Sequence, residues 1–177
     1  MIHISYDRRQ YQKDMIDNIA CFDNVVELGC HVGISTKIIS KLCQDGSVYA
    51  FDNSPESVEA MNNLGIEYSN IEFKHADVRD KNLIYDFAKK HPDIDVLCID
   101  LGGGYHPDTV FKVFFLWSSI LKPRVSLLRN RGLIDFINSS NSNEKYSSEC
   151  GYLSTCADNI TPNGYKKIQK DIKRIKK

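Results

Sequence analysis

Four carboxylates stand at the ends of apolar, strand-like segments of the chain: Glu27, Asp52, Asp77 and Asp100. Because the carboxyl ends of parallel strands meet at one edge of a sheet, we expect these side chains to line a common site. The sequence contains no P-loop lysine, so the set is unsuited to a triphosphate. A row of carboxylates instead suits a cationic nucleoside.

The first of these acids opens a glycine-rich turn, Glu27-Leu28-Gly29-Cys30-His31-Val32-Gly33. A strand, a glycine turn and a helix beginning near Ile34 would offer free backbone N–H groups to a ligand. The turn departs from the dinucleotide fingerprint, because an acid precedes the first glycine and His31 replaces the middle one. A carboxylate at the mouth of the turn would repel phosphate and favour an ammonium or sulfonium group.

On this acid and glycine turn, residues 20–137 resemble the class I (Rossmann-like) S-adenosylmethionine-dependent methyltransferases, whose first motif has the same form. The resemblance implies S-adenosylmethionine as the cofactor and a methyl acceptor as the second ligand. It also implies a set of cofactor-binding residues in this chain: Glu27, Gly29, Cys30, His31, Gly33, Asp52, Asn53, Asp77, Val78 and Asp100.

Two of the acids have an alternative role as helix caps. Asp52 ends the predicted strand 47–51, where a carboxylate can accept hydrogen bonds from both hydroxyls of a ribose. Because Ser54 and Pro55 supply the cap and first position of the next helix, we expect Asp52 to be free for a ligand. The resembled family places an acid opposite the adenine amino group, and Asp77 fits that position, while Asp80 can cap the following helix.

The candidate catalytic residues, Asp100 and His106, follow the predicted strand 95–99 and flank the glycine loop 102–104. His106 is either a general base or a simple surface or cap residue. The run 99–106 looks somewhat like the fourth motif of the catechol-type O-methyltransferases, in which the acid helps to hold a divalent metal. The further acids of that motif are not evident, and one carboxylate is a poor magnesium site, so we predict no metal.

The acceptor itself is not identified by any motif, and a small molecule is favoured over RNA. Arg129 and Arg131 follow the predicted strand 125–128, and either receive an anionic acceptor or are ordinary solvated charges. Two other functions stay open. One is a non-catalytic cofactor-binding or regulatory protein of the same fold; the other is an aminopropyltransferase-like enzyme, although Asp100 has only Asp108 nearby as a second acid.

The elements that must position these residues alternate along the chain. A first strand is expected to end at Val25 and Val26, and further strands are expected at 47–51, 71–74, 95–99 and 125–128. Helices lie between them, and an amphipathic helix is expected at about 7–20. This order predicts an α/β fold with a doubly wound, mainly parallel sheet in three layers. The helix before Lys122 is apolar almost all round, so its aromatic residues should belong to the core. Only 152–160 could form a closing strand pair, after a polar loop at 138–148.

Length and composition indicate one soluble domain over residues 1–177. No apolar run reaches the ~20 residues of a membrane span, and charged residues interrupt the first 19 positions, so we expect a cytoplasmic protein without membrane contact. Six scattered cysteines predict reduced thiols, with Cys98 in the core and no standard zinc pattern at Cys150 and Cys156.

The formal net charge of zero is unevenly distributed. Residues 166–177 hold seven bases and one acid, a charge of +6, which leaves −6 on the rest of the chain. This tail could touch nucleic acid. We favour a helix that docks through Ile168, Ile172 and Ile175, so a nucleic-acid partner is possible but not favoured. With no separate substrate domain, a second copy or a partner subunit could complete the site.

Overall fold

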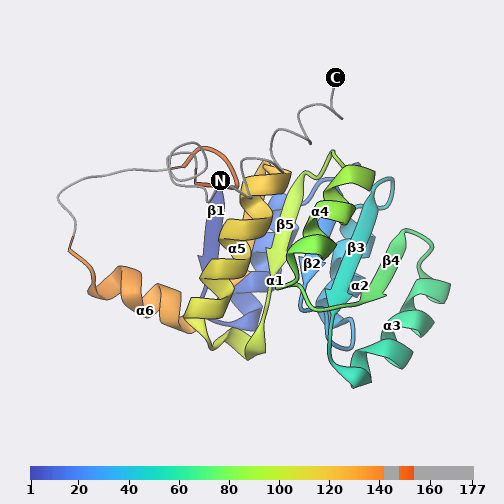
Figure 1. Cartoon of the computed structure of the whole chain (residues 1–177), viewed down its shortest axis with the longest axis horizontal. Helices are drawn as coiled ribbons and strands as arrows, with labels where there is room; N and C mark the ends of the chain where they lie inside the picture. Colours follow the sequence, from blue (N-terminus) through green and yellow to red (C-terminus); the bar gives the residue numbers. More distant parts are fainter. Residues whose placement is uncertain (142–147, 154–177) are drawn as a thin grey trace.

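The computed structural model describes residues 1–141 and 148–153, and Figure 1 shows its course. The elements are β1 (Ile2–Ser5), α1 (Arg8–Asn18), β2 (Asn24–Leu28), α2 (Ile34–Leu42), β3 (Ser47–Asp52), α3 (Pro55–Glu67), β4 (Ile71–His75), α4 (Lys81–Lys90), β5 (Val96–Ile99), a 3-10 turn (Gly102–Gly104), α5 (Pro107–Leu121), β6 (Val125–Arg129) and α6 (Arg131–Ser139).

One parallel sheet with the strand order β1-β6-β5-β2-β3-β4 organises these elements. Figure 1 shows α4 and α5 in front of the sheet and α1 and α2 behind it, which makes three layers. A separate apolar cluster fills the space on each face. The predicted doubly wound α/β fold is confirmed. The direction of strand progression reverses between β2 and β5, and open α/β sheets bind ligands at such a point.

The five predicted strands are present, and the structure adds β1, which the sequence did not predict. This strand has only four residues, Ile-His-Ile-Ser, a pattern too short to identify without its partner β6. The helix α6 continues to Ser139, into the segment expected to be a loop. The rest of that loop at 142–147, the closing strands beyond residue 153, Cys156 and the basic tail lie outside the described residues.

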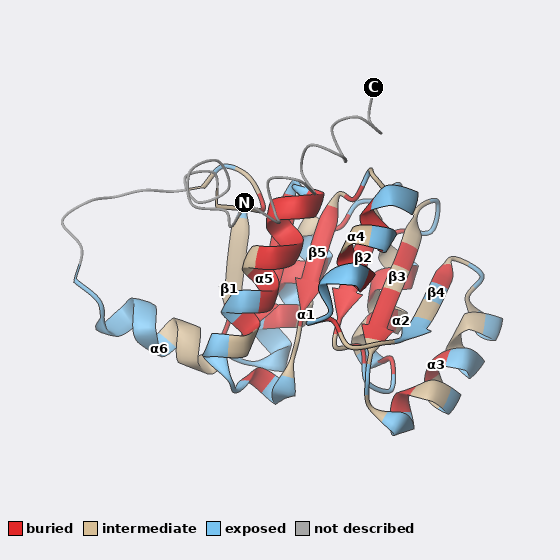
Figure 2. Ribbon diagram, in the orientation of Figure 1, coloured by how far each residue is buried: buried red, intermediate tan, exposed pale blue. Residues whose placement is uncertain are grey.

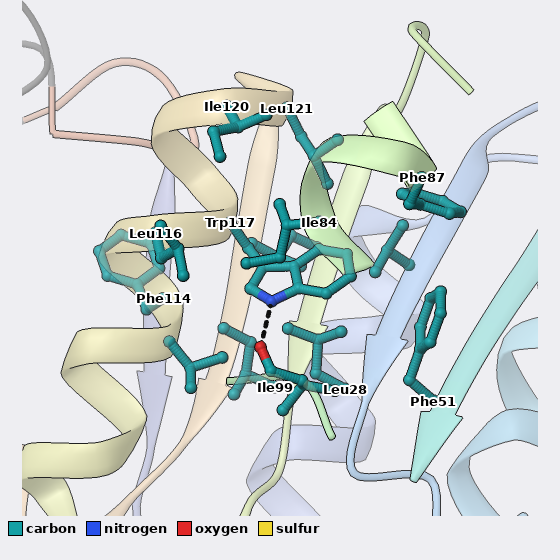
Figure 3. Packing of buried hydrophobic residues seen from close by; sticks show 14 of the residues in the cluster. Leu28, Phe51, Ile84, Phe87, Ile99, Phe114, Leu116, Trp117, Ile120 and Leu121 are labelled. Atoms are coloured by element: carbon teal, nitrogen blue, oxygen red, sulfur yellow. Dashed lines mark hydrogen bonds between the residues drawn. The ribbon is translucent and has the colours of Figure 1, made fainter. Parts of the chain in front are cut away.

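Helix α5 belongs to the core, as its composition predicted. Trp117 is fully buried, and its Nε1–H donates to the Val78 carbonyl over 2.8 Å. Figure 3 shows it surrounded by Leu28, Phe51 and Ile99 from the strands and by Ile84 from α4. Figure 2 shows the contrast between the largely buried α5 and α6, whose residues are intermediate or exposed. Cys98 is likewise fully buried. No helix in the described ranges combines the length and apolarity needed to span a bilayer.

Trp117→Phe should destabilise the fold by about 2–3 kcal/mol, because it leaves the Val78 carbonyl without its donor and opens a cavity under α5. The matched control is Phe111→Leu on the same helix, whose ring is 47% exposed. That variant should stay within about 0.5 kcal/mol of the wild type. Urea unfolding measures both, and equal losses would contradict the assignment of Trp117 to the centre of this core.

Candidate active site

The site is a cleft at the carboxyl edge of the sheet, above the reversal of strand order. It consists of two neighbouring cavities of about 330 and 430 Å³ that share Gly29, Asp52, Asn53, Leu101 and Gly102. The first, the β4-side cavity, is further lined by residues that include Phe51, Ala76, Asp77, Val78, His106 and Thr109. The second, the α1-side cavity, is further lined by residues that include Arg8, Cys30, His31, Ser35, Asp100 and Arg129.

The glycines of the turn have separate tasks. Gly29 has φ +89° and lines both cavities, and a Cβ there would lie 2.3 Å from the Asp100 carbonyl oxygen. Only glycine therefore lets the turn pass this close to the end of β5. Gly33 has φ +82° and lines neither cavity, and a Cβ there would collide with Met61 and Leu64 of α3. The absence of a side chain at Gly33 therefore lets the start of α2 pack closely against α3.

The sequence suggested that Glu27 stands at the mouth of the turn, and this prediction is wrong. It lies within β2, a strand covered by helices on both faces, and is only 1% exposed. Its Oε2 accepts a 2.6 Å hydrogen bond from the Thr36 hydroxyl. Burial raises the pKa of Glu27 to about 8; the Thr36 bond opposes this rise, and the charges of Asp100 and Asp52 add to it. The carboxyl group therefore lies beneath the cleft and keeps its proton at neutral pH.

Asp52 is not free in the way that the sequence suggested. Its Oδ2 accepts from the His31 N–H and its Oδ1 from the Ser54 N–H, each over 2.8 Å. Ser54 does occupy the N-cap position of α3, but its hydroxyl makes no capping bond and is buried without a partner in the described structure. Asp52 thus orients the turn and α3 itself. Each of its oxygens retains a second lone pair, and the side chain lines both cavities.

Asp77 lines the β4-side cavity and is paired with Arg79. The guanidinium Nε lies 2.8 Å from Asp77 Oδ1 and Nη2 lies 2.7 Å from Oδ2. These bonds hold the pKa of Asp77 below its usual value. Asp80 caps α4 by accepting from the Asn82 N–H, so the prediction of a separate capping acid is confirmed.

Asp100 forms an ion pair with Arg129 and accepts a hydrogen bond from it on Oδ2. Arg129 Nε donates to Oδ2 over 2.7 Å and Nη2 lies 2.7 Å from Oδ1. Burial raises the pKa of Asp100, and the Arg129 guanidinium opposes that rise. Arg129 is itself only 9% exposed, so the interpretation of it as a solvated charge is wrong. His106 is exposed and lines the β4-side cavity, so the two candidate catalytic residues face different cavities.

Sequence reasoning missed Arg8, the first residue of α1, which lines the α1-side cavity beside Arg129. The Asp7 side chain accepts from the Gln10 N–H and caps this helix, so the sequence did contain the signal for a helix starting at Arg8. What it lacked was β1. The pairing of β1 with β6 brings the start of α1 to the carboxyl edge of the sheet, and this pairing was not predicted.

A model of the methyltransferase domain family matches residues 26–130, which is more than half of the chain. The chain belongs to this methyltransferase family. Three solved structures show the same fold: the fibrillarin pre-rRNA processing protein of Methanococcus jannaschii, a candidate rRNA methylase from Clostridium thermocellum, and an O-methyltransferase family protein from Burkholderia thailandensis. A search of the curated proteins gave no match.

The structural likeness is one of fold, because the identities are low. The TM-scores are 0.53, 0.53 and 0.51 at identities of 14, 13 and 15% in the same order. The matches cover 89, 78 and 67% of this chain and 56, 82 and 36% of the other chains. The chain thus spans less than two thirds of the fibrillarins that it matches.

The electrostatics of this methyltransferase-family cleft differ from the expected row of anions. In the part of the chain that the structure describes, Glu27 holds a proton, Asp77 is paired with Arg79, and Asp100 is paired with Arg129. Asp52 is left as the carboxylate of the set without a cationic partner, and Arg8 adds a positive charge in the α1-side cavity. Four carboxylates therefore do not by themselves argue for a cationic ligand. No group of three metal-ligating side chains occurs within residues 1–141 and 148–153.

Glu27→Gln should change how stability depends on pH. Between pH 4.5 and 8 the unfolded wild-type chain releases the Glu27 proton while the folded chain keeps it, so wild-type stability falls as pH rises through this window. The glutamine variant lacks this loss. Since one pKa unit corresponds to about 1.4 kcal/mol, its stability relative to wild type should improve by on the order of 3 kcal/mol between pH 5 and pH 8.

Urea unfolding at several pH values measures this difference. The exposed Glu59→Gln on α3 is the matched control and should follow the wild-type curve. If the Glu27→Gln curve also ran parallel to wild type, Glu27 would be ionised in the folded protein.

Proposed function

We propose that this protein is an S-adenosylmethionine-dependent methyltransferase acting on a small-molecule acceptor. The observation that carries the proposal is the continuous cleft at the sheet reversal of a methyltransferase-family fold, in which Asp52 lines both cavities. When bound, S-adenosylmethionine supplies a methyl group that its sulfonium already activates. The chain then contributes mainly by orienting the two ligands and excluding water.

The residues of the two cavities fit such a ligand from end to end. Phe51, Ala76 and Val78 give the β4-side cavity apolar walls for an adenine ring, and Asp77 lies beside them as a hydrogen-bond acceptor. Asp52 has lone pairs left for ribose hydroxyls. Of the ten residues that the resemblance assigns to cofactor binding, Glu27 and Gly33 line neither cavity, and we assign them to the support of the turn.

Arg8 and Arg129 occupy the far end of the cleft and carry one positive charge more than their neighbour Asp100. This end suits the amino-acid part of the cofactor, with its carboxylate toward Arg8. A decarboxylated donor, as an aminopropyltransferase would use, would leave Arg8 without an anionic partner. We therefore favour methyl transfer over aminopropyl transfer.

The roles proposed for Asp100 and His106 differ in their support. Asp100 can act as a base only after it leaves Arg129, so we assign it to positioning Arg129 and the loop 102–104. His106 faces the β4-side cavity and keeps its candidacy as a general base only for an acceptor that reaches that side. This shortage of free bases also supports a second candidate function, a cofactor-binding protein without catalysis. Turnover with a labelled methyl donor would distinguish an enzyme from such a protein.

Asp52→Asn should raise the Kd for S-adenosylhomocysteine at least about tenfold in calorimetric titration, because an amide cannot accept at both positions and loses the charge. Asp17→Asn, an exposed position on α1, is the control and should bind like wild type. Ala76→Trp should abolish binding by filling the β4-side cavity while the hydrogen bonds of Asp52 stay intact. Full binding by both cleft variants would overturn the proposed cofactor site.

Arg8→Gln should weaken binding of S-adenosylhomocysteine about tenfold but leave binding of its decarboxylated analogue unchanged, because only the carboxylate meets Arg8. Arg9→Gln removes the neighbouring charge on the same helix, at an exposed residue that lines neither cavity, and should bind both ligands normally. If Arg8→Gln weakened both ligands equally, the carboxylate would lie elsewhere.

A further inference from the structure

An arginine lies between two tyrosine rings at the rim of the cleft. The Arg131 guanidinium carbon is 5.4 Å from the centre of the Tyr6 ring and 5.3 Å from that of Tyr105. Arg131 Nη1 lies 3.1 Å from the Tyr105 hydroxyl, and its Nε is buried without a partner in the described structure. Tyr6 and Tyr105 remain 47% and 57% exposed. We call these three residues the Arg131 cluster.

Buried polar contacts hold the cluster in place, so it is more than a chance surface contact. Asn130 is fully buried; its Nδ2 donates to the Tyr105 carbonyl over 2.8 Å and its Oδ1 accepts from the Leu133 N–H. Its own N–H donates to the Ser5 carbonyl. Asn130 therefore ties together the segments that follow β1, β5 and β6, and each of these segments provides one residue of the cluster.

None of the three cluster residues lines either cavity, but the cluster lies near Arg129, which lines the α1-side cavity. A Cβ on Gly104 would lie 3.8 Å from Arg129 Nη1 and 3.9 Å from Arg131 Cγ, so both arginine side chains lie close to Gly104. In the strand order, β6 and β1 lie beyond β5, while Asp52 ends β3 on the opposite side of β2. A ligand on the cluster would thus approach the cleft from the end opposite the ribose position.

We propose that the Arg131 cluster binds the methyl acceptor and that this acceptor is a small planar molecule with an acid group; this inference rests on the proposed function. The tyrosine faces favour a flat partner, and the planar guanidinium matches a carboxylate. No carboxylate within the described residues forms an ion pair with Arg131. Its charge is therefore available to a ligand, and the partner-less Nε adds an unfilled hydrogen-bond donor.

A nucleic-acid acceptor has weaker support from the same surface. Neutralising a phosphate backbone requires several cations, since each phosphate contact adds separately to affinity. The rim offers Arg131 and Arg8, and the chain apart from residues 166–177 has a net charge of −6. A single acid group on a small acceptor matches this surface better.

The test is a ligand titration of the full-length protein, followed by NMR with and without saturating S-adenosylhomocysteine. The probes are benzoate, 4-hydroxybenzoate and indole-3-carboxylate, each paired with its neutral primary amide, and a short oligouridylate. At least one acid should bind about tenfold tighter than its amide. Arg131→Gln should remove this preference, Arg131→Lys should retain part of it, and Arg9→Gln should retain all of it. Tyr6→Leu should weaken acid and amide alike.

The outcomes separate this inference from the function on which it rests. If S-adenosylhomocysteine fails to bind, the proposed function fails, whatever the acids do. If it binds and no acid exceeds its amide, or if Arg131→Gln leaves the preference intact, the acceptor inference is wrong. Oligouridylate binding that depends on Arg131, with no preference for the small acids, would also overturn it in favour of an RNA acceptor. Thermal unfolding of each variant distinguishes lost binding from lost folding.

Discussion

The ion pair between Asp100 and Arg129 is the interaction on which the site depends. It joins the residue directly after β5 to the last residue of β6, so it couples these two strands on one side of the sheet reversal. Buried ion pairs are weak evidence for stability, because desolvation offsets their attraction, whereas removing one partner leaves a costly unpaired charge. The value of this pair therefore lies in its position. It fixes two charged side chains in the lining of the α1-side cavity.

The same pair changes the electrostatic meaning of the acidic edge. A strand-end carboxylate signals a cationic ligand only if it remains charged and unpaired. In this protein the proton on Glu27 and the arginines beside Asp77 and Asp100 offset three such groups. Complementarity then resides in a carboxylate at Asp52, where the two cavities meet, and a guanidinium at Arg8 in the α1-side cavity. A long ligand with hydroxyls near its middle and a carboxylate at one end fits this distribution better than a compact cation.

How far the sequence could predict this arrangement depends on the range of each interaction. Local signals were sufficient for α2, for the five predicted strands and for Asp80 as a cap, because each depends on residues a few positions apart. The family resemblance was also correct. The long-range pairs were beyond reach: Asp100 meets Arg129 across 29 positions, and Arg8 reaches the cleft only because β1 pairs with β6. The protonation of Glu27 likewise follows from its burial within the folded sheet.

The supply of bases then constrains the chemistry that this cleft can support. Asp100 is held by Arg129, Glu27 lies beneath the turn with its proton, and Asp52 already accepts two backbone hydrogen bonds. An acceptor on the α1 side would therefore meet cationic rather than basic side chains. Guanidinium groups lower the pKa of a nearby acidic hydroxyl by stabilising its anion. The cleft would thus suit an acceptor whose nucleophilic group loses its proton easily. An acceptor whose nucleophilic group is itself acidic would need no general base.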